Sequence, residues 1–296
     1  MTPMQGILMS VPERKKDMRK ISEKNTRPLE NTEIQELVPA SYSTQPIKYA
    51  SEKYSFVPTI GVVNLLRDVG WVPVYARQAL VRKPERDGFQ KHMIRFTKPC
   101  LNFGGERVDL ILYNSHDCGC AFNLTASVWR KICSNGLMVS NDMFNFSHKH
   151  INFDADQLIQ SSLTIGHQAG ILADNVEKLK AIEMTPDERG VYAMAAHQLV
   201  YANVEDAPIA PDKLLTEKRY DDNNKDLWTT FNVVQENIIR GGLPTDYSYR
   251  NRIRSNGGRP QKYTRGIKSL DKDIKLNKSL WTLTEYFQSL KTKMNH

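Results

Sequence analysis

The residues best suited to bind another molecule lie near the C-terminal end of the sequence. No aspartate or glutamate occurs between Tyr247 and Leu270, whereas seven arginines and lysines do. Such cations neutralise phosphates, and tyrosine rings interleaved with them can stack on nucleobases. The predicted nucleic-acid-binding residues of this stretch are Tyr249, Arg250, Arg252, Arg254, Arg259, Lys262, Tyr263, Arg265 and Lys268.

A second group of cations falls on two strand-like runs in the N-terminal half. Arg77 lies on the first run, and Lys91 and Arg95 lie on the second. Successive strand residues point to opposite faces, so Lys91 and Arg95 share one face. These three residues are further candidates for phosphate contacts. The alternative is that they only protect a sheet edge or keep the surface charged.

The segment from Asn114 to Asp117 carries the best enzymatic candidates, His116 and Asp117. A histidine beside a carboxylate can act as a general base and can orient Ser115 as a nucleophile. Asparagine and aspartate are also favoured in turns, because their side chains bond to nearby backbone. The turn interpretation is preferred over the catalytic one.

Two histidines form a weak metal candidate. His148 and His150 share a face if the chain is extended there, and Asp154 follows closely. Asp154 is equally suited to begin a helix, and no third ligand motif is present. Cys118 and Cys120 are too closely spaced for the usual zinc pair. No metal or cofactor is therefore predicted.

A polar cluster lies on a predicted helix over residues 226–240, just before the basic stretch. Glu236 and Arg240 are four residues apart and can pair on one helix face. Asn232, Gln235 and Asn237 accompany them. The cluster is interpreted as a buried network that orients the helix, and the alternative is a site beside the basic stretch.

Composition limits the classes of protein to consider. The chain has 296 residues, a formal net charge of +8 and 25% charged residues. This excess of positive charge favours nucleic acid or another anionic partner. No apolar run approaches the ~20 residues of a membrane helix, and no secretory signal is recognisable. The expectation is a cytoplasmic protein of a bacterial host cell, with no membrane partner and with reduced thiols.

The predicted elements divide the chain into three parts. Residues 1–50 are polar and proline-containing, which predicts a flexible arm. Residues 51–153 alternate apolar and polar side chains and predict an antiparallel sheet with packed helices. Residues 154–296 predict a helical part that contains the basic loop, and residues 51–296 together form one module.

Local signals place the individual elements of the sheet part. A helix begins near Thr59 and ends at Gly70. Strands follow at 71–82, 89–98 and 107–114, with Asp87-Gly88 as a hairpin signal. A short strand at 121–124, a helix at 125–134 and edge strands at 137–140 and 144–153 complete this part.

The helical part has clearer boundaries. Leu158, Ile165, Leu172 and Leu179 recur every seven residues and mark one face of a long helix. Thr185-Pro186-Asp187-Glu188 is a capping box that starts the next helix. Helices are also predicted over 226–240 and 270–291. The fold class is α+β: antiparallel hairpins with a packed helix, followed by a mainly helical C-terminal half.

Several short motifs in a fixed order resemble a known family. They are VPVYARQ at 72–78, GFQKHM at 88–93, NSHD at 114–117, CSNGL at 133–137, LWTTFN at 227–232 and QEN at 235–237. The chain resembles, over about residues 50–292, the phage/plasmid-like family that carries a domain of unknown function. The resemblance implies a mobile-element context and no particular activity. The order of hairpins and helix is also loosely similar to single-strand annealing proteins, by analogy alone.

The leading hypothesis is a non-enzymatic protein of a phage or plasmid that binds single-stranded DNA or RNA. It would promote strand annealing or recombination. Whether it does so as a monomer or as a homo-oligomer is left open by the sequence. One alternative is a hydrolase or nuclease that depends on His116 or a metal. Another is a protein–protein adaptor or anti-defence factor that uses the apolar face from Leu158 to Leu179.

Overall fold

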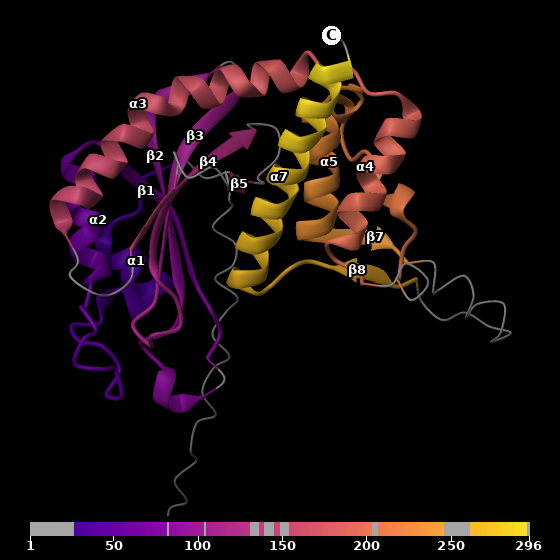
Figure 1. Ribbon diagram of the computed structural model, residues 1–296. Coiled ribbons are helices and arrows are strands. Elements are labelled where there is room, and N and C mark those ends of the chain that lie inside the picture. Colours follow the sequence, from indigo (N-terminus) through magenta and orange to yellow (C-terminus); the bar gives the residue numbers. More distant parts are fainter. Residues whose placement is uncertain are drawn as a thin grey trace, which may run out of the picture.

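An antiparallel sheet and a group of helices are bridged by one long helix. The structure is a computed structural model that describes residues 27–81, 83–103, 105–130, 136–138, 145–148, 154–202, 207–245 and 261–294. Figure 1 shows helix α3 (Ala155–Lys180) running along the sheet and on towards helices α4, α5 and α7. The predicted α+β class is confirmed.

Every strand pairing of the main sheet is antiparallel. The order is β1-β2-β3-β4-β5, and β6 pairs with the other half of the β4 edge. The strands are β1 (Val72–Gln78), β2 (His92–Phe103), β3 (Glu106–Asn114), β4 (Phe122–Arg130), β5 (Gly136–Met138) and β6 (Asn145–His148). Among the described residues, β5 and β6 correspond to the two predicted edge strands.

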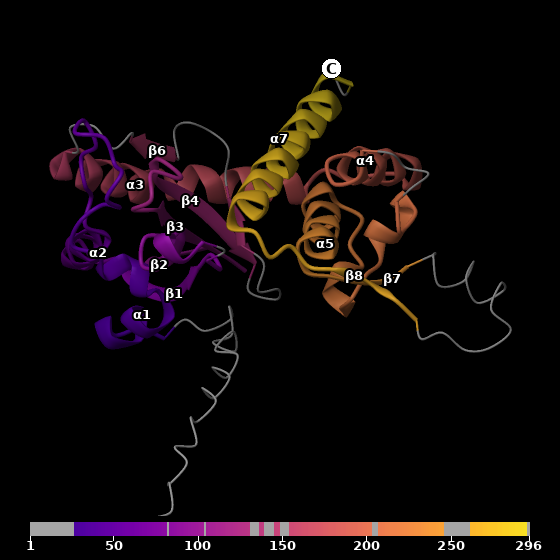
Figure 2. The same cartoon turned by 90° about the horizontal axis from the view of Figure 1, so that it is seen from below.

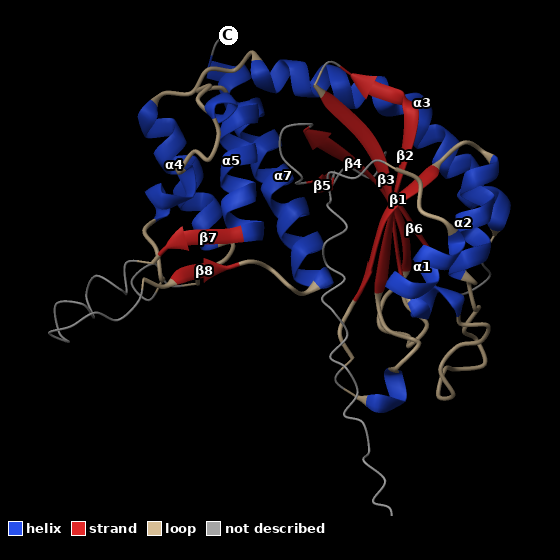
Figure 3. Ribbon diagram, turned by 180° about the vertical axis from the view of Figure 1, so that it is seen from behind, coloured by secondary structure: helices blue, strands red, loops and turns tan. Residues whose placement is uncertain are grey.

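The two faces of the sheet differ in chemistry. One face carries Ile94, Leu110 and Leu124, which join the main core together with α2 (Thr59–Asp68) and α3. On the other face Met93, Ile111 and Tyr113 pack against Leu270 in a smaller cluster. Figure 3 shows the sheet from behind with α2 and α3 against it. The alternation of the strands therefore separates a large apolar core from a more polar face.

The prediction of a helix at 125–134 is wrong for its described part. Strand β4 continues to Arg130 and keeps register with β3, from Tyr113 opposite Asn123 to Glu106 opposite Arg130. Leu124, Ala126 and Val128 are buried with a period of two residues. Pairing with a central strand that is buried on both faces outweighs the local helical pattern.

The first helix and the first hairpin agree with their sequence signals. Helix α2 ends before Gly70, which has a φ of +89°. Strands β1 and β2 pair as predicted, although their connection runs from residue 79 to 91 and includes a short 3-10 helix, η3 (Pro84–Arg86). Gly88 has a φ of +86° in this connection, a conformation that glycine adopts without strain.

Residues 27–50 correct the predicted boundary of the N-terminal arm. They form α1 (Asn31–Leu37) and the short helix η2 (Pro39–Tyr42), and residues 1–26 lie outside the described residues. Leu29 and Ile34 are fully buried in the main core. The backbone N–H of Leu29 donates to the carbonyl of Pro73 on β1 at 2.8 Å. Burial of these two side chains against an edge strand orders a segment whose composition suggested a flexible tail.

The helical part begins with two confirmed N-terminal caps. The Asp154 side chain accepts from the backbone of Asp156 and Gln157 at the start of α3. Thr185 and Glu188 form the predicted capping box of α4 (Pro186–Gln198). The heptad residues of α3 are buried in the core of this chain. Their burial leaves the predicted apolar face without surface to offer an adaptor partner.

Helix α5 (Leu227–Arg240) lies at the centre of the helical part, beside α7 (Leu270–Met294), with a two-stranded sheet at one end (Figure 2). This sheet consists of β7 (Gly241–Pro244) and β8 (Tyr263–Arg265). Two short helices, η5 (Pro211–Leu215) and η6 (Tyr220–Asp222), precede α5. Within the described ranges, no helix is long and apolar enough to cross a membrane.

Candidate nucleic-acid interface

The β7–β8 hairpin carries the described end of the basic stretch. Gly241 pairs with Arg265 and Pro244 pairs with Tyr263, while the N–H of Thr245 donates to the carbonyl of Lys262 at 2.9 Å. The connection between the two strands holds residues 246–260. Most of the predicted cations therefore belong to a connection whose two ends are set close together by backbone hydrogen bonds.

Four predicted binding residues of the basic stretch are described, and all four are exposed: Lys262, Tyr263, Arg265 and Lys268. Tyr263 keeps 58% of its surface exposed. No ion pair joins Arg265 or Lys268 to another described residue. Tyr263 and Arg265 are two residues apart on β8 and share a face of the hairpin. Tyr249, Arg250, Arg252, Arg254 and Arg259 lie outside the described residues.

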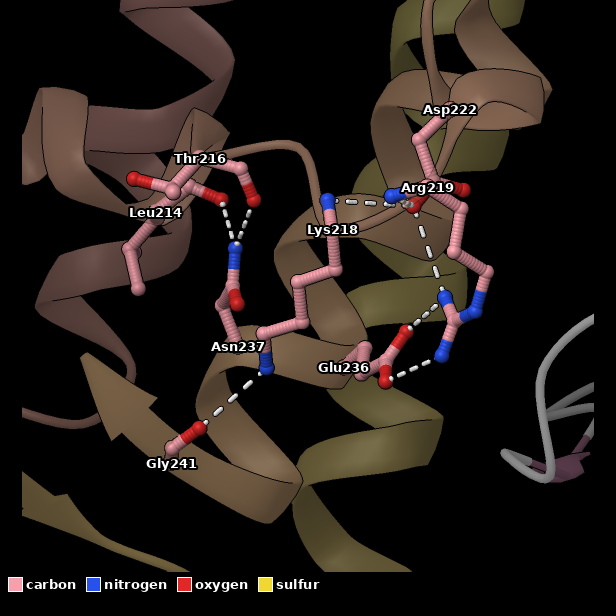
Figure 4. A network of polar contacts seen from close by, with 8 residues as sticks. All are labelled: Leu214, Thr216, Lys218, Arg219, Asp222, Glu236, Asn237 and Gly241. Atoms are coloured by element: carbon pink, nitrogen blue, oxygen red, sulfur yellow. Dashed lines mark hydrogen bonds and ion pairs between the residues drawn. The ribbon is translucent and has the colours of Figure 1, made fainter.

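A network of polar contacts lies beside the start of β7, at the C-terminal end of α5 (Figure 4). Glu236 accepts two hydrogen bonds from the Arg219 guanidinium, at 2.6 and 2.7 Å. Asp222 accepts from the backbone N–H of Arg219 at 3.1 Å. Burial by itself would raise the pKa of Glu236, but Arg219, with the charges of Lys218 and Arg240, holds it below its usual value. Glu236 is therefore a buried carboxylate held in its charged form.

The same network attaches the hairpin to the segment before α5. Lys218 Nζ donates to the carbonyl of Gly241 at 3.2 Å. Asn237 Nδ2 donates to the carbonyls of Leu214 and Thr216, each at 2.9 Å. Burial lowers the pKa of Lys218, opposed by Glu236 and reinforced by the charge of Arg219. Asn237 of the predicted polar cluster thus attaches α5 to the segment before it, which agrees with the interpretation as a packing network. Lys218, which lies outside the predicted cluster, contacts the first residue of β7.

Gly241 is the tightest point of the hairpin. Its φ is +65°, and a Cβ added there would lie 2.6 Å from the carbonyl oxygen of Thr264 and 2.8 Å from the carbonyl carbon of Arg265. Gly242 has a φ of +85°, but no atom lies within 4 Å of a Cβ built on it. A side chain at Gly242 would therefore bring backbone strain alone, whereas a side chain at Gly241 would bring the same strain and a steric clash.

Gly241→Ala is expected to cost about 1–3 kcal/mol from backbone strain and, in addition, to force β8 away from β7. Gly242→Ala should carry the strain alone. Chemical denaturation gives the stability of both variants, and amide hydrogen exchange at Thr245 and Ile267 reports the hairpin. Equal loss of protection in the two variants would contradict the role assigned to the Gly241 contact.

The predicted cations of the main sheet point to its polar face, where carboxylates meet them. Arg77 Nη2 lies 2.5 Å from Asp273, and Lys91 Nζ lies 2.7 Å from Asp271. Both carboxylates belong to the first turn of α7. Lys91 and Arg95 do share a face, as alternation required. Arg77 and Lys91 are therefore each already paired with a carboxylate of this chain.

The prediction that Arg95 contacts phosphates does not fit its position in the sheet. Its side chain is fully buried, with Nε 3.5 Å from Asp109, which is fully buried as well. Its guanidinium lies over the ring of Tyr75 at 5.6 Å. Asp109 also accepts two hydrogen bonds from Arg107, at 2.7 and 2.8 Å. A guanidinium sealed inside this cluster cannot reach a phosphate, so Arg95 contributes to the interior of the sheet.

The catalytic interpretation of His116 and Asp117 is not supported by the geometry. His116 is fully buried, and its Nε2 lies 3.2 Å from Thr59 Oγ1. Ser115 Oγ instead accepts from the backbone N–H of Cys120, at 3.2 Å. Asp117 accepts from the N–H of Gly119 at 2.9 Å, which is the turn contact that the residue types favoured. His116 is oriented by a threonine in the core.

The metal candidates are not brought together in the described residues. The His148 side chain and all of His150 lie outside them. Asp154 serves as the N-cap of α3. Across the part of the chain that the structure describes, no group of three or more metal-ligating side chains occurs. Cys100 and Cys118 are exposed free thiols, and Cys120 is half-buried.

Comparison with known proteins places the chain among its relatives. The family described as Domain of unknown function (DUF932) matches residues 46–281. The chain belongs to this family. The DUF932 region contains α2, the main sheet, the β7–β8 hairpin and the first half of α7, whereas α1 lies before it. The predicted resemblance to a family of unknown function is thereby confirmed.

Two curated relatives of this DUF932 protein come from Escherichia coli strain K12. The UPF0380 protein YfjQ is 33% identical over 263 residues, which cover 88% of this chain and 91% of the relative. The UPF0380 protein YafZ is 31% identical over 260 residues, with the same coverage. No solved structure matches the chain.

The sequence pointed to Glu236 and Asn237 of the DUF932 region but missed their partners, which are Arg219 for Glu236 and the carbonyls of Leu214 and Thr216 for Asn237. These partners lie in the segment before α5, and only the folded chain brings them to this helix. Asp271 and Asp273 were missed in the same way. Acidic residues are favoured in the first turn of any helix by the helix dipole, so their positions did not indicate distant cationic partners.

Proposed function

We propose that the protein binds single-stranded DNA or RNA through the β7–β8 hairpin and the basic connection that it carries. The observation that supports this most directly is the exposed row of Lys262, Tyr263, Arg265 and Lys268. Arginine and lysine would neutralise phosphates, and the Tyr263 ring would stack on a base. A hairpin presents both kinds of side chain on one small surface.

The attachment of the hairpin favours this role. Lys218 and Asn237 hold the start of β7 and the end of α5 in place, and the N–H of Ile267 donates to the carbonyl of Ile239 at 2.8 Å. A fixed root places Tyr263 and Arg265 at defined positions. Such preorganisation lowers the entropic cost of ordering side chains on binding.

The mobile-element setting, strand annealing and assembly into a homo-oligomer belong to the same proposal. Neutralising the phosphates of two strands would reduce their mutual repulsion, which is the physical requirement of annealing. A hydrolase based on His116 is the weaker alternative, because that ring is fully buried and bonded to Thr59.

Replacing Arg265 and Lys268 together by alanine tests the proposal. If all seven cations of the basic stretch contact phosphates, log K should fall with log salt with a slope of about −5. Removing two contacts should lower that magnitude by about 1.4, which corresponds to roughly 25-fold weaker binding at 0.1 M salt. Fluorescence anisotropy with a labelled single-stranded oligonucleotide, titrated at several salt concentrations, measures both quantities.

A matched control removes the same charge from another surface. Lys48 and Lys53 are exposed in the N-terminal half, and their double alanine variant should keep the salt slope. Tyr263→Ala should weaken binding without changing the slope, since stacking involves no counterion release. Equal effects of both double variants would refute the hairpin as the binding surface.

A further inference from the structure

The first turn of α7 places two carboxylates on the polar face of the main sheet. Asp273 Oδ2 lies 2.5 Å from Arg77 on β1. Asp271 Oδ2 lies 2.7 Å from Lys91 Nζ, and Asp271 Oδ1 accepts from the Tyr113 hydroxyl at 2.5 Å. In this way two acidic residues cover three hydrogen-bond donors, which lie on β1, on β3 and in the residue before β2.

These three donors have the chemistry of a phosphate site. Arg77 pairs with Met93 across β1 and β2, and Met93 pairs with Tyr113 across β2 and β3, so Arg77 and Tyr113 lie on one line across the sheet. A guanidinium, an ammonium and a phenol hydroxyl are all common donors to nucleic-acid phosphates. Carboxylate oxygens that occupy them stand where phosphate oxygens would bind.

This face lies next to the proposed interface along the chain. Asp271 follows Lys268 by three residues, a separation of at most about 10 Å in extended chain. Asp271 is 56% exposed and Lys91 is 25% exposed at the side chain. Water reaches the pair of Lys91 and Asp271, and such exposed pairs contribute little to stability, so a competing anion can displace Asp271 at small cost. The side chain of Asp273 is only 15% exposed, and its Oδ1 also accepts from Asn277 Nδ2 at 2.8 Å, so its displacement costs more.

Other contacts hold α7 independently of these ion pairs. Leu280 and Trp281 are fully buried in the main core. Asn277 Oδ1 accepts from Gln235 Nε2 of α5 at 2.6 Å. Leu270 in the first turn is itself buried against Met93, Ile111 and Tyr113. Loss of the two ion pairs therefore requires movement of the Asp271 and Asp273 side chains, while the helix keeps its packing.

We propose that Arg77, Lys91 and Tyr113 form a second phosphate-binding surface, which Asp271 and Asp273 cover until nucleic acid displaces them. This inference rests on the proposed function and extends it, because a strand bound at the hairpin would continue onto the sheet. The acidic turn acts as an internal competitor for the same donors. It limits binding to ligands that carry several phosphates close together.

The double variant Asp271→Asn, Asp273→Asn tests this surface. Uncovering two cations should add about 1.4 to the magnitude of the salt slope and tighten binding of a labelled single-stranded oligonucleotide roughly 25-fold at 0.1 M salt. Adding Arg77→Ala and Lys91→Ala to that variant should abolish the gain. Asp271→Asn alone, at the more exposed position, should give about half the change in slope.

The control is Asp68→Asn, Asp174→Asn, which changes the net charge equally at two exposed positions. It should leave the slope unchanged, because overall charge alone adds no phosphate contact. If the protein binds but neither Asp271→Asn nor the double variant Asp271→Asn, Asp273→Asn alters the slope, the second surface is disproved and the hairpin proposal stands. If no variant and no parent protein binds the oligonucleotide, both proposals fall.

Discussion

Glu236→Gln is expected to lower the free energy of unfolding by about 2–4 kcal/mol. The side chain of Glu236 is only 7% exposed, and it accepts both terminal nitrogens of Arg219. The glutamine amide has the same shape but only one oxygen, so it cannot accept from both nitrogens of Arg219. The half-buried Arg219 guanidinium, which lies near Lys218, would then lack its main counter-charge. Urea denaturation followed by circular dichroism measures the loss.

Glu177→Gln is the control for this change. Glu177, whose side chain is 66% exposed, pairs with Lys180 in the last turn of α3. Exposed ion pairs contribute ~0–1 kcal/mol, so this variant should stay near the parent stability. If the two variants lost the same amount, the network of Figure 4 would not hold the hairpin root as its geometry implies.

Lowering the pH from 7 to 4 is expected to remove roughly 3 kcal/mol of stability through His92 alone. Burial lowers the pKa of His92 to about 4, well below the usual value of about 6.5 for a histidine. Its Nε2 lies 2.9 Å from Thr59 Oγ1, and its Nδ1 lies 3.0 Å from the carbonyl of Gln90. The neutral ring is therefore the form that this site accommodates.

The sign follows from proton uptake. Between pH 6.5 and 4 the unfolded chain binds a proton at His92 while the folded chain does not, so stability falls as the pH falls. His92→Gln removes this titration and should flatten the pH dependence of the unfolding free energy over that window. His167→Gln, at an exposed position of α3, should leave the dependence intact. A parent protein with constant stability from pH 6.5 to 4 would contradict the assignment.

The segment from Asn114 to Asp117 is explained by the same buried cluster. Asn114 Nδ2 donates to Thr59 Oγ1 at 3.0 Å, so one threonine hydroxyl meets Asn114, His92 and His116. The ring centroids of the two histidines are 5.2 Å apart. This arrangement joins the start of α2 to the ends of β2 and β3. The residue types that suggested a general base serve to orient these elements.

Local chemistry in the sequence determined much of the secondary structure. Thr185 with Glu188, and Asp154, start their helices by contacts within three residues, which the order of residues alone specifies. The alternation of Val108, Leu110 and Leu112 in β3 and the seven-residue period of α3 likewise specify which side chains face the main core. The α+β class follows from the change of period along the chain.

Only the tertiary structure decided the partners of the charged residues. Lys91 and Asp271 are separated by 180 positions, and Arg77 and Asp273 by 196. No local pattern records such pairings, so Arg77, Lys91 and Arg95 had the same appearance in the sequence although Arg95 is buried beside Asp109. The error at β4 has the same origin, since pairing with β3 outweighed local helical preference. Periodicity acts over a few residues, whereas charge pairing and strand order depend on which distant segments the core brings together.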